Sequence, residues 1–153
     1  MATTKTEKLS QFVIIFIAIS ALLISIWQVR VSQTHNRLTV QPRLNIDSGT
    51  STINSQQEFS ITLTNHGFGP AMIKGFEIRV DGEIQSNWNE AVAKMGLQGT
   101  MTKAANLPEN QVVAAGNEQI LLTLIGYQGD NRGSLKITYE SIYQEEFIVE
   151  ESF

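Results

Sequence analysis

The stretch from Leu9 to Val29 contains no charged residue, and most of its side chains are apolar. As an α-helix these residues would span roughly 30 Å, which is close to the thickness of the hydrocarbon core of a bilayer. The sequence therefore predicts one transmembrane helix, with Phe12, Ile15, Leu22 and Trp27 in the span. Trp27 suits the interface, because its ring can lie in the apolar zone while its N–H meets water.

Two other interpretations of this stretch fit less well. A cleaved signal peptide needs small residues just after its apolar run, but the run here ends in the bulky segment 26–31 without an Ala-x-Ala pattern. A buried helix of a soluble protein needs a helical partner, and the remaining chain has no comparable helix. We therefore expect an uncleaved anchor: a polar tail at 1–8, the helix and its extension at 9–36, and one further domain at 37–153.

Small residues recur on one side of the expected helix, at Ala18, Ala21 and Ser25. Such a stripe lets two transmembrane helices approach closely, so these residues are candidates for a helix–helix contact; the frequency of small residues in such helices is the simpler explanation.

The orientation of the anchor depends on a small difference in charge. Three basic residues follow the helix, and two precede it: Arg30, Arg37 and Arg43 against Lys5 and Lys8. The positive-inside rule then favours a cytoplasmic carboxyl-terminal domain. A basic start can also deliver the domain to the outside, and the absence of cysteine fits both compartments.

The chain after the helix is long enough for one domain with one core. Residues 44–153 carry six basic and fourteen acidic side chains, a net charge of −8. This surface argues against nucleic acid as a partner, because phosphates require basic patches; simple solubility also explains it.

Alternating apolar residues predict a β domain. We expect a first, edge-type strand over 38–47 that accommodates Pro42, a polar loop over 47–56, and a half-buried strand over 58–64 with Phe59, Ile61 and Leu63 inward. The third strand changes register, which predicts a bulge at Lys74-Gly75, and Asp81-Gly82 predicts a tight turn.

The second half of the domain begins with a short predicted helix over 86–95. Asn87 or Ser86 would cap it, Glu90 would complete a capping box, and Trp88, Val92 and Met95 would pack on the sheets. A long loop is expected over 96–110, followed by a central strand over 118–125 and a hairpin of strands over 134–140 and 145–150. Short strands at this spacing predict a mainly β fold, a two-sheet sandwich with a short helix.

The segment 65–71, Asn-His-Gly-Phe-Gly-Pro-Ala, follows a Phe-x-Ile-x-Leu strand and precedes an Ile-x-Val-Asp-Gly turn. This arrangement resembles the core of immunoglobulin-like and fibronectin-III-like sandwiches. The whole layout, including 25–27, 35–38 and 139–143, is similar to uncharacterised single-span bacterial membrane proteins with such a domain. The resemblance implies a bacterial inner membrane and no agreed activity. The chain departs from true immunoglobulin domains, because it has no cysteine pair and no tryptophan on its third strand.

Motifs for chemistry are sparse. His35 and His66 lie on separate predicted elements, so a metal site would need carboxylate help. The glycines at 67 and 69 match neither a dinucleotide fingerprint nor a P-loop, and no Gly-x-Ser-x-Gly occurs. The many carboxylates are expected on solvated faces. We therefore expect no enzyme activity, no metal and no cofactor.

Three residues are candidates for contact with a partner: His66, Phe68 and Tyr143. Pro70 favours burial of His66 and Phe68 at the end of the sandwich, and Tyr139 should pack in the core with Leu135 and Ile137.

Two functions remain open for such a chain. The first is a membrane-tethered interaction module that binds a protein partner or forms a homo-oligomer. The second is a ligand-binding or enzymatic accessory subunit whose site forms only in a complex. A pocket that contains His66 and two buried carboxylates would favour the second.

Overall fold

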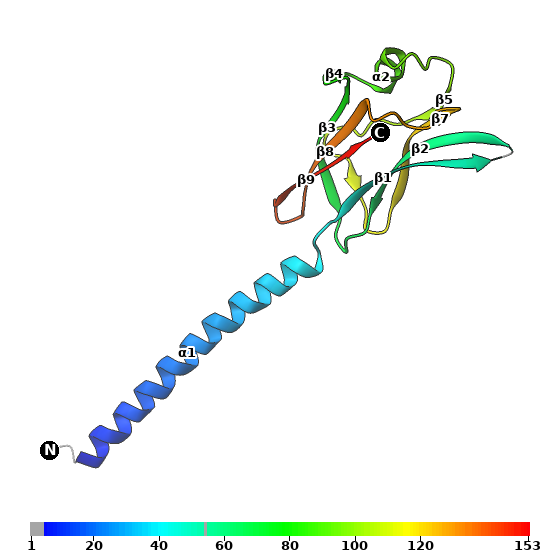
Figure 1. The fold of residues 1–153 in the computed structure, drawn as a ribbon. Coiled ribbons are helices and arrows are strands. Elements are labelled where there is room, and N and C mark those ends of the chain that lie inside the picture. The colour runs from blue at the N-terminus through cyan, green and yellow to red at the C-terminus, as the bar shows by residue number, and fades with distance from the viewer. Residues whose placement is uncertain (1–4, 54) are drawn as a thin grey trace. The chain divides into compact units, whose positions relative to one another are not determined.

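A computed structural model describes residues 5–53 and 55–153 of the chain (Figure 1). The chain forms two compact units that divide after Leu38. The first unit is helical. The second, which begins at Thr39, is mainly β, with two antiparallel sheets and a short helix.

Helix α1 runs without interruption from Lys5 to Thr39. Its segment from Leu9 to Thr39 is long and apolar enough to cross a membrane, with a mean hydropathy of 2.6 over its most apolar window. The hydroxyls of Ser20, Ser25 and Thr34 each donate to the carbonyl four residues earlier, at 2.8, 2.9 and 3.1 Å. These hydroxyls are thus satisfied inside the helix, and for Ser20 and Ser25 this is what a lipid environment would require.

The helix starts and ends beyond the predicted bounds. It begins at Lys5, inside the segment expected to be a polar tail, and residues 1–4 of that tail lie outside the described residues. It ends at Thr39, three residues before Pro42. Proline lacks an N–H and disfavours helical geometry at the residue before it, which explains the end of the helix here.

Two sheets make up the β unit. One has the strand order β1-β2-β7-β5, formed by β1 (Leu44–Ile53), β2 (Gln56–Asn65), β7 (Glu118–Ile125) and β5 (Met101–Ala104). The other has the order β4-β3-β8-β9, formed by β4 (Glu83–Gln85), β3 (Ala71–Val80), β8 (Gly133–Glu140) and β9 (Glu146–Ser152), and the short β6 (Val112–Val113) also pairs with β3. All these pairs are antiparallel.

Several local predictions are confirmed. The register of β3 against β8 shifts between Ile73 and Gly75, where the bulge was expected. The β3–β4 turn has positive φ at both Asp81 (53°) and Gly82 (81°), which is typical of a tight hairpin turn. Strand β7 spans the predicted residues and lies between β2 and β5.

Asn87 caps the short helix α2 (Trp88–Lys94) as predicted, and Glu90 bonds back to the backbone N–H of the residue before the cap rather than to that of the cap itself. The Glu90 N–H donates to Asn87 Oδ1 at 3.0 Å, and Glu90 Oε2 accepts from the Ser86 N–H at 3.0 Å. Trp88, Val92 and Met95 are buried, as expected.

Two predictions about the strands were wrong. The first strand does not begin at Leu38 but at Leu44, and it continues to Ile53 through the segment predicted as a polar loop. Pairing explains this difference, because each residue from Leu44 to Ile53 has a partner on β2. The polar Ser and Thr residues of this segment form a strand because β2 lies beside them, not because of their own sequence pattern. The predicted long loop likewise contains β5, a short edge strand that pairs with β7.

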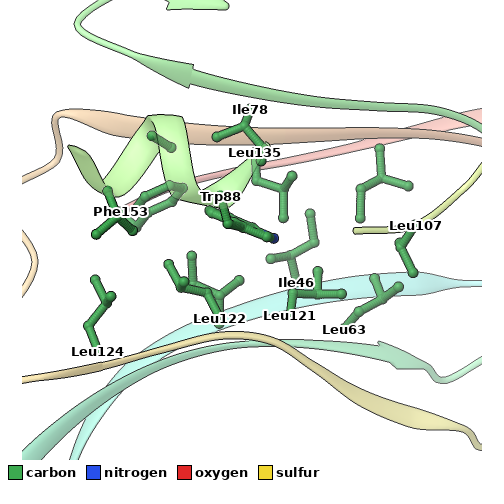
Figure 2. Packing of buried hydrophobic residues seen from close by; sticks show 14 of the residues in the cluster. Ile46, Leu63, Ile78, Trp88, Leu107, Leu121, Leu122, Leu124, Leu135 and Phe153 are labelled. Carbon is green, nitrogen blue, oxygen red and sulfur yellow. The ribbon is translucent and has the colours of Figure 1, made fainter. Parts of the chain in front are cut away.

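The core lies between the two sheets, and Figure 2 shows its side chains meeting from both layers. Trp88 enters this layer from α2 and lies 5.9 Å from the ring of Phe153. Phe153 is only 2% exposed, and its backbone exchanges two hydrogen bonds with Gly133, each 2.9 Å long. Gly133 has no room for a side chain, because a Cβ there would lie 2.3 Å from the Phe153 ring.

Candidate functional site

Asn65, the last residue of β2, is fully buried and uses its whole side-chain amide. Its Oδ1 accepts from the N–H groups of Arg43 and Gly67, at 3.1 and 3.0 Å. Its Nδ2 donates to the carbonyls of Gly69 and Val113, at 2.9 and 3.1 Å. One neutral side chain therefore joins the start of β1, the β2–β3 loop and β6, and it does so with every hydrogen-bonding position filled.

The β2–β3 loop (residues 66–70) lies against the segment 40–43 that leads into β1. The His66 N–H donates to the Arg43 carbonyl at 2.8 Å, and the Phe68 N–H donates to the Gln41 carbonyl at 3.2 Å. A Cβ on Gly67 would lie 2.4 Å from Arg43 N, and one on Gly69 would lie 1.7 Å from the Val40 oxygen. Glycine is required at both positions because backbone meets backbone there, and the loop is held in one conformation.

This loop exposes its aromatic side chain. Phe68 is 83% exposed, and His66 is exposed as well. The expectation that Pro70 would accompany burial of these two residues was wrong. The glycines pack the loop backbone against residues 40–43 instead, and the side chains of His66 and Phe68 are exposed.

A second loop at the same end of the sandwich has a similar construction. Ser141 is buried at the end of β8, and its Oγ accepts from the N–H groups of Tyr143 and Glu145, at 3.2 and 3.3 Å. Next to it, Ile142 is 57% exposed and Tyr143 is 43% exposed. In both loops a buried polar side chain fixes the backbone, and apolar side chains are left on the surface.

The strand register places these two loops at one end of the sandwich. Met72 pairs with Glu140, the last residue of β8, and with Val112 of β6, which is 55% exposed. Leu44, where β1 begins, pairs with Asn65. We call this end the tether end, because residues 40–43 enter the sandwich there (Figure 1).

Exposed large apolar side chains concentrate at the tether end. Among the β-unit side chains that the structure describes, six such residues are exposed: Phe68, Ile84, Val112, Ile142, Tyr143 and Ile148. Four of them lie at the tether end, and we call this set of four the apolar cap: Phe68, Val112, Ile142 and Tyr143. Exposed apolar side chains gathered at one end of a domain make that end a candidate interaction surface.

Two aromatic residues that flank the β8–β9 turn, Tyr139 and Phe147, are structural. Tyr139 is 5% exposed, and its hydroxyl accepts from the Leu44 N–H at 3.3 Å. Its ring stacks on Phe147 at a centroid distance of 5.4 Å. The prediction that Tyr139 packs in the core is confirmed.

The opposite end, which we call the far end, carries charged groups in exposed contacts with one another. Arg132 donates to both carboxylate oxygens of Asp81, at 3.0 and 2.7 Å. The Tyr127 hydroxyl donates to Asp130 at 2.6 Å. The hydrogen bond from Arg132 lowers the pKa of Asp81, whereas burial, with the bond to Asp130, raises the pKa of Tyr127 to about 12.

The described residues offer little for catalysis. The buried polar side chains among them are Asn65, Thr123 and Ser141, and all three are uncharged. Within the same part of the chain, no group of three His, Cys, Asp or Glu residues could hold a metal ion. His66 is exposed rather than enclosed with buried carboxylates, so the pocket that would favour an accessory enzyme site is not formed by these residues.

Sequence reasoning missed several residues of this site. Asn65 continues the inward series of Phe59, Ile61 and Leu63 at a spacing of two, and this periodicity was the signal that it would be buried. Val112 and Ile142 carried no comparable signal. Val112 belongs to the two-residue strand β6, and Ile142 follows the end of β8, and the bounds of both strands depend on pairing with other strands.

The residues singled out on α1 are all on its surface. Phe12, Ile15, Leu22 and Trp27 are between 57% and 70% exposed. In the small-residue stripe, Ser25 donates its hydroxyl to Ala21 of the same helix, so it needs no hydrogen-bond acceptor on another helix. Ala18, Ala21 and Ser25 stay a prediction for a close helix contact.

Comparison of the sequence with protein-family models and with curated proteins finds no match.

Proposed function

We propose that this chain is a single-pass, membrane-anchored interaction module without catalytic activity, which presents a β-sandwich at the bilayer surface to a protein partner. The apolar cap carries this proposal, since two loops ordered by Asn65 and Ser141 expose Phe68, Ile142 and Tyr143. A loop whose backbone is already fixed loses little conformational entropy on binding, which makes Phe68 the expected centre of the interface.

The strand order supports an immunoglobulin-like topology for the module. In chain order the strands β1, β2, β3, β5, β7, β8 and β9 take the places of A, B, C, D, E, F and G, with sheets A-B-E-D and C-F-G. Strand β4 then lies beside C as an additional edge strand, as C′ does in related domains.

The proposal places α1 in a bacterial inner membrane with the sandwich in the cytoplasm. The basic residues flanking the apolar stretch support this side, three after it against two before it. The chain has no cysteine, so single cysteines can report the side directly. We expect Ala115→Cys, at an exposed position, to resist a membrane-impermeant maleimide in intact cells, and Ala2→Cys to react. The reverse pattern would place the domain outside.

The interaction itself is tested by migration of the full chain in mild detergent. We expect the wild type to run in an assembly larger than a monomer and Phe68→Ser to release it. Ile84→Ser is the matched control, because Ile84 is 61% exposed but lies on β4, away from the tether end. A monomeric wild type, or an assembly indifferent to Phe68, would contradict the proposed function.

A further inference from the structure

The part of α1 beyond Trp27 carries a second unpaired apolar feature. We call residues 28–38 the stalk; it is about 16 Å long at 1.5 Å per residue. Trp27, Val31 and Leu38 are 67%, 51% and 63% exposed. They occur at spacings of four and seven residues with Thr34 between them, so they share one helix face. We call the part of this face that lies in the stalk, from Val31 to Leu38, the stalk stripe.

The stalk and the sandwich are complementary in charge as well as in apolar surface. The stalk contains Arg30, His35 and Arg37 and no acidic residue, whereas residues 44–153 have a net charge of −8. Basic residues beside an apolar stripe and an acidic domain with an apolar cap attract each other. Two caps facing each other would instead bring two acidic domains together.

Few residues separate the end of the stalk from the segment that holds the β2–β3 loop. Leu38 is the last residue of the helical unit, and Gln41, three residues later, accepts the hydrogen bond from the Phe68 N–H. In each copy the β2–β3 loop is therefore hydrogen-bonded to a residue three positions after the end of the stalk.

From these observations we infer that the partner is a second copy of this chain, and that the apolar cap of each copy packs on the stalk stripe of the other. This inference rests on the proposed function and names its partner. The contact area of a few side chains is small for a stable complex in solution. Confinement of both copies to one membrane, and then to one micelle of mild detergent, raises their effective concentration, so a small reciprocal contact is sufficient.

The absence of cysteine allows a test between copies. Two differently tagged full-length chains are produced together, one with Phe68→Cys and the other with Leu38→Cys, and native membranes are oxidised. Because each chain holds one cysteine, any disulfide joins two copies. We expect an adduct that carries both tags. The control replaces Phe68→Cys by Ile84→Cys, a similarly exposed residue outside the cap, and should lose that adduct.

Charge provides a second readout in the same experiment. We expect Arg30→Glu in the Leu38→Cys chain, or high salt, to lower the yield of the two-tag adduct, because both weaken attraction to the acidic sandwich. A yield that neither change lowers would overturn the charge argument.

Other outcomes overturn the inference in distinct ways. An adduct between two Phe68→Cys chains only would indicate a cap-to-cap contact, and an adduct with another protein would indicate a different partner. If the wild-type assembly depends on Phe68 but no two-tag adduct forms, this inference fails while the proposed function stands. A wild-type chain that runs as a monomer in mild detergent would contradict both this inference and the proposed function.

Discussion

The two ends of the sandwich differ in which kind of side chain is buried between the sheets and which is exposed. At the far end a phenylalanine, Phe153, is inserted between the sheets, and the polar contacts around it, between Asp81 and Arg132, are exposed. At the tether end the polar group is inside, as Asn65, and a phenylalanine, Phe68, is outside. A buried amide whose hydrogen bonds are all satisfied can thus take the place that a buried aromatic ring has at the other end. The aromatic side chain then stays on the surface, where it can bind.

The largest difference between the ends should appear when the two phenylalanines are truncated. Phe153→Ala removes a ring that contacts Phe59 and Trp88, and we expect a loss of about 3–5 kcal/mol in the free energy of unfolding. Phe68→Ala, the matched variant at the tether end, should change it by less than about 0.5 kcal/mol. Urea unfolding of the full chain in detergent measures both, and equal losses would show that Phe68 is a core residue.

A somewhat smaller loss is expected from Asn65. Asn65→Ala leaves two backbone N–H groups and two carbonyls of the tether end without partners, which should cost about 2–4 kcal/mol. Asn106→Ala, at an exposed position, should have almost no effect. Hydrogen exchange at the Gly67 amide should also accelerate in Asn65→Ala; an unchanged rate would mean that the glycine contacts alone hold the loop.

The smallest effect concerns pH and belongs to the far end. The pKa of Tyr127 is raised to about 12 in the folded state, so folding favours its protonated form. Stability from this group is fully present below the ordinary tyrosine pKa near 10 and is lost as the pH rises from about 10 to 12. The stability of Tyr127→Phe should fall less over this interval. An identical fall in both proteins would show that Tyr127 ionises normally.

Local patterns in the sequence were sufficient for much of the fold. Alternation identified β2 and β8, an apolar character on both faces identified β7, and the change of register at Lys74-Gly75 identified the bulge. The capping residues Asn87 and Glu90 identified α2, because their hydrogen bonds connect residues three or four apart. Strands β1 and β5 escaped prediction in whole or in part, because their polar residues become strand only when a neighbour pairs with them.

The candidate site depends on contacts between residues that are far apart in the sequence. His66, Phe68 and Tyr143 were candidates from residue type and loop position, but their exposure could not be read from the sequence. Phe68 is exposed because Gly67 and Gly69 bring the loop backbone onto residues 40–43, more than twenty positions earlier in the chain. Pro70 suggested the opposite outcome because it indicates a turn and says nothing about what the turn packs against.

The sequence by itself determined the apolar length of α1, the acidic charge of the sandwich and the two-sheet class, since each depends on composition or on short-range periodicity. Only the tertiary structure decided that Val112 from β6 and Ile142 and Tyr143 from the β8–β9 turn lie at the same end as Phe68. Strand pairing brings residues from three distant segments to one end, and the energy that selects this pairing comes from burying the core rather than from the residues of the cap.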